Sequence, residues 1–235
     1  MRQTSRSDPA ALERALGHTF GDRDLLTLAL THRSVSGTRN NERLEFLGDS
    51  ILGHVIAAEL FRRFVDASEG QLTRARARLV NGEALARIAE GFSLGSYVRL
   101  GPGEMKSGGF RRSSILADCV EALIGAVYLD AGLEASAGCV LSWYGQQLAD
   151  LRIEDVVKDP KTRLQEFLQG RGLPLPQYEV VETAGKAHAQ QFRVTCVAEG
   201  VAVPVDAWGE SRRVAEQIAA EQVLALLETE AGGRG

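Results

Sequence analysis

The sequence lacks several features that would indicate a protein class at once. It has no excess of positive charge, because 27 Lys and Arg residues stand against 31 Asp and Glu, giving a net charge of -4 over 235 residues. It also has no uninterrupted apolar run of the roughly 18 residues that a membrane-spanning helix needs, so we expect no membrane segment. Proteins that bind nucleic-acid phosphates are usually basic overall, so this mild acidity argues at first against such a partner.

Cysteine is scarce as well. The three cysteines are odd in number and far apart, with no C-x-x-C pair or zinc spacing, which favours a reducing compartment. The first nine residues are polar and show no apolar core of a secretory signal peptide, so we expect a cytoplasmic protein. The composition, 44% hydrophobic and 25% charged, is that of an ordinary globular protein and excludes a disordered polyelectrolyte.

Two regions differ in hydrophobic pattern: residues 8–150 and residues 159–229, joined by a charged linker at 151–158. In the first region apolar residues recur at helical spacing and never alternate with a period of two, which predicts an all-α domain. The glycine-rich residues 101–109 are expected to form a loop. The helices are expected at residues 9–16, 25–30, 44–64, 70–80, 83–92, 113–129 and 133–148.

The second region begins with Asp159-Pro160, a typical N-cap and first helical residue, and helical spacing follows over 162–169. Strand-like runs come next, at residues 177–183, 190–197 and 201–208. Ser211 is expected to cap a last helix, with an apolar face made of Val214, Ile218, Val223 and Leu227 or their neighbours. This order predicts a small α+β domain of α-β-β-β-α topology.

Acidic residues lie on otherwise apolar helices of the first region. At about 100° per residue, Glu45 and Asp49 fall within about 60° of Glu42 on one helix, and Asp118 and Glu121 share a face of another. Such carboxylates are either solvated polar faces or, if partly buried, groups that must bind a cation or take up protons. Oxygen ligands from two helices would suit a hard cation such as Mg²⁺ or Mn²⁺.

The segment that carries three of these acids, residues 41–50 (NERLEFLGDS), resembles the signature of the bacterial ribonuclease III endonuclease domain. The similarity extends to residues 30–34 and to the glycine-rich and acidic segments between 101 and 125. Residues 159–229 resemble a double-stranded RNA-binding domain, in the same order as in that family. The resemblance covers nearly the whole chain and implies an all-α endonuclease domain followed by an α+β RNA-binding domain.

The resemblance implies roles for individual acids. Glu45, Asp118 and Glu121 match the carboxylates that hold the catalytic Mg²⁺, for which Mn²⁺ can substitute. Asp49 and Glu121 match the residues regarded as catalytic.

It also implies a homodimer. Glu42 and Glu69 match two further acidic positions that line the cleft of the family dimer, and Phe46 matches an aromatic residue that packs into the partner subunit. Core packing is the alternative interpretation of Phe46.

The implied activity is metal-dependent cleavage of double-stranded RNA to 5′-phosphate and 3′-hydroxyl ends, without an organic cofactor. The expected roles are maturation of ribosomal RNA precursors and processing of some messenger and transfer RNAs. The alternative is a non-cleaving regulator that binds double-stranded RNA through the second domain alone. The complete set of acids argues against that alternative.

For the second domain the resemblance points to Gln165, His188, Arg212 and Arg213 as RNA contacts. Duplex RNA is recognised through its shape, 2′-hydroxyls and phosphates, and the two arginines stand at the start of a capped helix, where the helix dipole favours phosphate. The chain departs from the domain's usual pattern at Ala207, where a glycine is common, and at Glu216, where a basic residue is common. Both departures predict weaker phosphate binding, Ala207 through reduced freedom of a loop.

Overall fold

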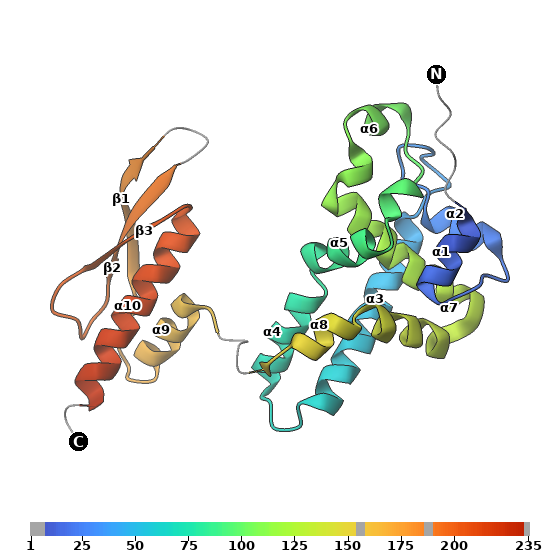
Figure 1. Ribbon diagram of the computed structural model, residues 1–235. Coiled ribbons are helices and arrows are strands. Elements are labelled where there is room, and N and C mark those ends of the chain that lie inside the picture. Colours follow the sequence, from blue (N-terminus) through green and yellow to red (C-terminus); the bar gives the residue numbers. More distant parts are fainter. Residues whose placement is uncertain (1–7, 154–157, 186–189, 233–235) are drawn as a thin grey trace. The chain divides into compact units, whose positions relative to one another are not determined.

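The computed structural model describes residues 8–153, 158–185 and 190–232 (Figure 1). The chain divides into two compact units, Met1–Val156 and Val157–Gly235. The segment expected to be a linker begins with Leu151, which is 8% exposed and belongs to the core of the first unit. At least the start of that segment therefore packs on the helical unit.

The first unit is helical, as its hydrophobic spacing predicts. A short helix, Pro102–Lys106, lies inside the segment expected to be a loop. It has five residues and opens with proline at its first position, so it shows no apolar periodicity in the sequence. The helices are α1 (Pro9–Leu16), α2 (Arg23–Ala29), α3 (Glu42–Arg63), α4 (Glu69–Leu79), α5 (Gly82–Gly91), α6 (Pro102–Lys106), α7 (Ser113–Trp143) and α8 (Gly145–Asp150), with 3-10 turns η1 (Leu94–Ser96) and η2 (Gly109–Arg111).

Helices α3 and α7 form the centre of this unit (Figure 1). Helix α3 carries acids in its first turn and arginines in its last, the arrangement that complements the helix dipole. Helix α7 is interrupted at Gly132, whose φ of 83° is readily adopted only by glycine. Its first half is nearly all buried, with fully buried side chains at Val120, Leu123, Ile124 and Val127.

The second unit has the predicted α-β-β-β-α order. Asp159 caps α9 (Pro160–Gln169) by accepting a hydrogen bond from Lys161 N. Strands β1 (Gln177–Ala184), β2 (Gln191–Val197) and β3 (Val205–Gly209) form one antiparallel sheet in that order, followed by α10 (Arg212–Gly232). Both helices contribute to the core of this unit, whose buried members include Leu164, Leu168, Cys196, Ala219, Val223 and Leu227.

Three expectations for this unit need correction. Strand β3 begins at Val205 rather than at residue 201. Val223 and Leu227 are buried as expected, but Ile218 is 36% exposed, and the inward face of α10 also contains three alanines, which carry too little hydrophobic signal to mark it. Ala207 is a buried residue within β3, paired with Val194, so its side chain packs in the core and costs no loop freedom.

Candidate active site

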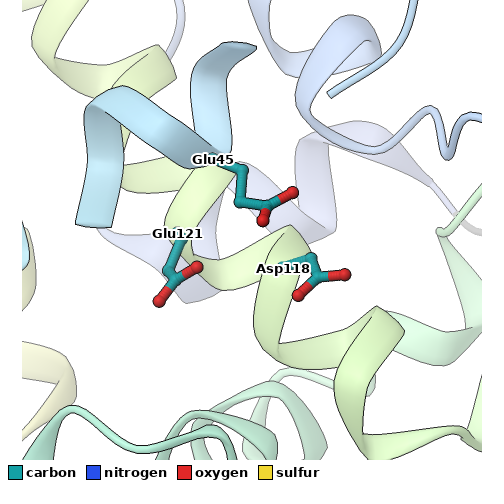
Figure 2. Close-up of side chains that lie close together, drawn as sticks. All are labelled: Glu45, Asp118 and Glu121. Carbon is teal, nitrogen blue, oxygen red and sulfur yellow. The ribbon is translucent and has the colours of Figure 1, made fainter. Parts of the chain in front are cut away.

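Three carboxylates converge where α3 meets α7. Glu45 projects from α3, and Asp118 and Glu121 project from α7 (Figure 2). One ligand atom from each lies within 4.8 Å of the others, and all three side chains are half-buried. In the described part of the chain, no Lys, Arg or His forms an ion pair with any of them. Three mutually repelling oxygen donors without an ion-paired cation match the ligand set of a hard divalent cation.

Two glycines allow the helices to approach closely enough for this cluster. A Cβ atom at Gly48 would lie 1.8 Å from the backbone oxygen of Glu121, and one at Gly125 would lie 2.4 Å from that of Leu44. Any side chain at either position would push one helix away from the other. Because Glu45 and Glu121 lie one turn or less from these contacts, the glycine pair sets the distance between their carboxylates.

Asn41 holds the start of α3 against its surroundings. It is 2% exposed, its backbone N donates to the oxygen of Thr31 at 2.9 Å, and its side-chain Nδ2 contacts Cys119 Sγ at 3.7 Å. Cys119 follows Asp118 directly, so Asn41 connects the first turn of α3 to the part of α7 that carries the cluster. Nothing in the sequence except the family signature singles out this asparagine.

The surroundings of the cluster disfavour its charged form. Burial, followed by repulsion from Asp49, Glu45 and Asp118, raises the pKa of Glu121 to about 7. Burial also raises the pKa of Glu45, to which repulsion from Asp118 adds. It raises the pKa of Asp118 as well, against the opposing charges of His32 and Arg33. A bound cation would reverse this balance by stabilising all three carboxylates.

A cleft of about 460 Å³ opens beside the cluster. Its walls carry positive as well as negative groups, since Arg33 and Arg112 line it with Glu45 and Asp118. The arginines are paired with other acids, Arg33 with Glu42 at 3.5 Å and Arg112 with Glu104 at 3.1 Å. Arg33 was not among the residues predicted for the site. The resemblance at residues 30–34 contained a signal for Arg33.

The remaining predicted acids are arranged differently. Glu42 is exposed and lines the same cleft. Asp49 is exposed at the edge of the cluster, close enough to raise the pKa of Glu121. Glu69, at the start of α4, accepts a hydrogen bond from Thr73 and lines a separate hollow with Phe61 and other residues. A single protomer therefore does not bring Glu69 to the carboxylate cluster.

Phe46 is 77% exposed, so it is not a core residue of the protomer. It lies one residue beyond Glu45 on α3, next to the carboxylate cluster. Phe61, further along the same helix, is 74% exposed.

The second unit presents the other predicted residues. Gln165 on α9 and Arg212 and Arg213 on α10 are exposed. Ser211 Oγ accepts a hydrogen bond from Val214 N at 3.3 Å, which confirms it as the cap of α10. His188 lies outside the described residues.

Two family models match the chain. The model described as "Ribonuclease-III-like" matches residues 22–148, and the model described as "Double-stranded RNA binding motif" matches residues 160–227. This chain belongs to the ribonuclease III family. It is therefore an endoribonuclease for double-stranded RNA, with a helical nuclease unit and a separate RNA-binding unit.

Relatives within the ribonuclease III family match along almost their full length. The protein named "Ribonuclease 3" from Hahella chejuensis is 60% identical over 216 residues, which is 92% of this chain and 95% of that protein. That from Pseudomonas aeruginosa is 58% identical over 221 residues, 94% of this chain and 96% of that protein.

A solved structure of a ribonuclease III nuclease domain, from Campylobacter jejuni, is similar to this chain. It is 40% identical with a TM-score of 0.59, and covers 60% of this chain and 99% of that domain. Among the helices that the structure describes, none is long and apolar enough to cross a membrane.

Proposed function

We propose that Glu45, Asp118 and Glu121 bind Mg²⁺, which Mn²⁺ can replace, and that cleavage leaves 5′-phosphate and 3′-hydroxyl ends. The convergence of three half-buried carboxylates, none of them ion-paired among the described residues, carries this proposal. An oxygen-only ligand set favours Mg²⁺ or Mn²⁺ over zinc, which prefers nitrogen and sulfur. A divalent cation bound there would activate a water molecule and stabilise the charge that develops on the phosphodiester oxygens.

Asp49 and Glu121 are the proposed catalytic residues. Glu121 has a pKa of about 7 before any cation is bound, so its carboxylate can gain or lose a proton near neutral pH. Asp49 is exposed beside it and is accessible to substrate. The arginines of the cleft, Arg33 and Arg112, can attract phosphate groups toward the carboxylates while their own acidic partners hold them in place.

We also propose that the protein acts as a homodimer with Phe46 in the interface. The outer side of α3 supports this proposal, because the exposed Phe46 and Phe61 fall on one side of the helix at helical spacing, with the half-buried Gly53 and Ala57 between them. Exposed aromatic residues of this kind usually mark an interface. A region involved in dimer formation has been described for the nuclease domain from Campylobacter jejuni. In such a dimer Glu42 and Glu69 would line the cleft.

The second unit is proposed to bind the duplex through Gln165, His188, Arg212 and Arg213. The exposure of Gln165 and of both arginines supports this, as does the capped helix end beneath the arginines. The expected substrates are ribosomal RNA precursors and some messenger and transfer RNAs. A cytoplasmic location follows from these substrates and is supported by three free cysteines.

The decisive experiment incubates the protein with long duplex RNA in Mg²⁺ and, separately, in EDTA, and then identifies the ends of the products. Cleavage only in Mg²⁺, with 5′-phosphate and 3′-hydroxyl ends, is the expected result. Retention of uncut duplex in Mg²⁺ would contradict it and favour a non-cleaving RNA-binding regulator.

A further inference from the structure

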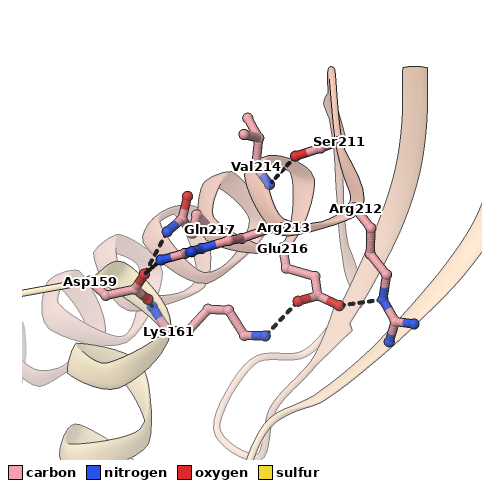
Figure 3. A network of polar contacts seen from close by, with 8 residues as sticks. All are labelled: Asp159, Lys161, Ser211, Arg212, Arg213, Val214, Glu216 and Gln217. Carbon is pink, nitrogen blue, oxygen red and sulfur yellow. Dashed lines mark hydrogen bonds and ion pairs between the residues drawn. The ribbon is translucent and has the colours of Figure 1, made fainter. Parts of the chain in front are cut away.

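Glu216 is a buried carboxylate within the face of the second unit that is proposed to meet RNA. It stands on the first turns of α10 and is 8% exposed. Its Oε1 accepts a hydrogen bond from Arg212 Nε at 2.8 Å, and its Oε2 accepts one from Lys161 Nζ at 2.5 Å (Figure 3). One acid thus joins cations from two different helices.

A second acid reinforces this connection between the helices. Asp159, the cap of α9, accepts a hydrogen bond from Gln217 Nε2 at 2.5 Å and lies 4.0 Å from Arg213 Nη2 (Figure 3). The ammonium group of Lys161 also lies 4.4 Å from the centre of the Tyr178 ring on β1. The start of α9, the start of α10 and the sheet are therefore fixed relative to one another by polar contacts.

Among the described residues, the network leaves most of the N–H donors of Arg212 and Lys161 without a hydrogen-bond partner. Arg212 uses only Nε to bind Glu216, its side chain is 65% exposed, and its two terminal nitrogens point away from the carboxylate (Figure 3). Lys161 has three donors, of which Glu216 occupies one. Although burial opposes ionisation, hydrogen bonds from Lys161 and Arg212 lower the pKa of Glu216, so it is charged at neutral pH.

We propose that Glu216 is a positioning residue for RNA binding, which holds Arg212 and Lys161 at a fixed spacing so that both present N–H groups to backbone phosphates. This inference rests on the proposed RNA-binding role of α10. Pre-ordering two long, flexible side chains reduces the entropy lost when phosphate binds. The competing interpretation is that Glu216 merely cancels positive charge and weakens binding.

The two interpretations predict opposite changes in RNA affinity for the substitution Glu216→Gln. Glu216→Gln removes a negative charge from the RNA-binding unit while keeping the shape of the side chain. If Glu216 positions the cations, the full-length variant binds duplex RNA in EDTA roughly tenfold more weakly, the loss expected for a charge-assisted phosphate contact. The slope of log affinity against log salt also becomes shallower by about one, because fewer phosphates are neutralised. Equal or tighter binding would overturn the proposal.

Glu221→Gln is the matched control. Glu221 is an exposed acid on the same helix, so its substitution changes the net charge equally without touching Lys161 or Arg212. The affinity of the Glu221→Gln variant for duplex RNA should not fall. Thermal melting of each variant reports its folding. If Glu216→Gln does not fold, Glu216→Asp, which keeps the charge but shortens the side chain, replaces it with the same expected sign.

Arg212→Ala separates the failure of this inference from the failure of the RNA-binding face. Unchanged affinity in Arg212→Ala would refute the proposed face itself. Weaker binding by Arg212→Ala together with undiminished binding by Glu216→Gln would refute only the positioning role. If Glu216 acts through Arg212, most of the loss caused by Glu216→Gln disappears in the Arg212→Ala background, whereas a general structural defect would persist there.

Discussion

Glu121 occupies surroundings that disfavour its charged form. Its pKa of about 7 lies well above the ordinary value of 4.5, because it is buried and faces the charges of Asp49, Glu45 and Asp118. Between these two values the folded protein binds more protons than the unfolded chain does. Without a divalent cation, the contribution of Glu121 to the free energy of unfolding is therefore fully present below pH 4.5 and is lost as the pH rises through 7.

Binding of Mg²⁺ should therefore depend on pH in a defined way. Because Glu121 must lose its proton to become a ligand, affinity should rise by up to about tenfold per pH unit below pH 7 and level off above it. Calorimetric titration with Mg²⁺ between pH 5.5 and 8.5 measures this directly. Glu121→Gln serves as the control and should remove most of the dependence. A flat profile in the unsubstituted protein would contradict the pKa assigned to Glu121.

At this scale the sequence could supply the identity of the acids but not their arrangement. The helical spacing of Glu45 with Asp49, and of Asp118 with Glu121, indicated two acidic faces, and only the family resemblance indicated that they meet. The sequence alone does not show that Glu69 lies apart from the carboxylate cluster of the same protomer. Arg33 in the cleft was missed because an arginine on a surface segment has no distinguishing periodicity.

The contact between helices α3 and α7 holds the site together. It depends on two glycines whose hydrogen atoms face the backbone of the opposite helix. A glycine within a helix normally costs about 1 kcal/mol relative to alanine. Here each glycine is explained by the close approach of α3 to α7 that it permits. The distances within the carboxylate cluster depend on that approach.

Gly48→Ala should therefore destabilise the protein by about 3 kcal/mol or more, because the new methyl group would overlap a backbone oxygen that no rotamer change can move. It should also weaken Mg²⁺ binding by displacing Glu45 from Glu121. Urea unfolding followed by circular dichroism measures the stability. Gly138→Ala is the matched control: Gly138 is also helical and has open space around it, so this variant should gain about 0.5–1 kcal/mol. Equal stability of the two variants would refute the role of the close contact.

The longer elements were largely predictable from the sequence. Helices α3 and α7 and the α-β-β-β-α order all follow from apolar spacing and caps such as Asp159 and Ser211. The sequence failed for α6, which is too short to show a period, and for the start of β3, where apolar residues after Gly200 belong to a loop. On α10 it placed Val223 and Leu227 correctly, but it included the exposed Ile218 and missed the buried alanines, because alanines carry little hydrophobic signal.

Across the whole molecule, the net charge of -4 conceals an uneven distribution. Five of the acids predicted for the site lie in or beside the cleft: Glu42, Glu45, Asp49, Asp118 and Glu121. Without them 26 acids would face 27 basic residues, a net charge of +1. The acidity that argued against a nucleic-acid partner is thus partly concentrated at the candidate metal site, where bound cations would offset it.

Phe46→Asp should convert the proposed dimer into a monomer, because it places a charge in an apolar contact between subunits. Sedimentation velocity at micromolar concentration reports the change. Val203→Asp is the matched control, since Val203 is also largely exposed, at 68%, but lies in the second unit. A Phe46→Asp variant that sediments as a dimer would show that the interface lies elsewhere.

Glu45, Asp118 and Glu121 are proposed to form the metal site at which duplex RNA is cut. The most direct test measures cleavage and retention of one long RNA duplex in the same Mg²⁺ samples, for the unsubstituted protein and for Glu121→Gln. We predict that Glu121→Gln retains the duplex with unchanged affinity and loses cleavage by at least about a hundredfold, as expected when a metal-bound acid or base is removed. Undiminished cleavage by Glu121→Gln would contradict the assignment of the site.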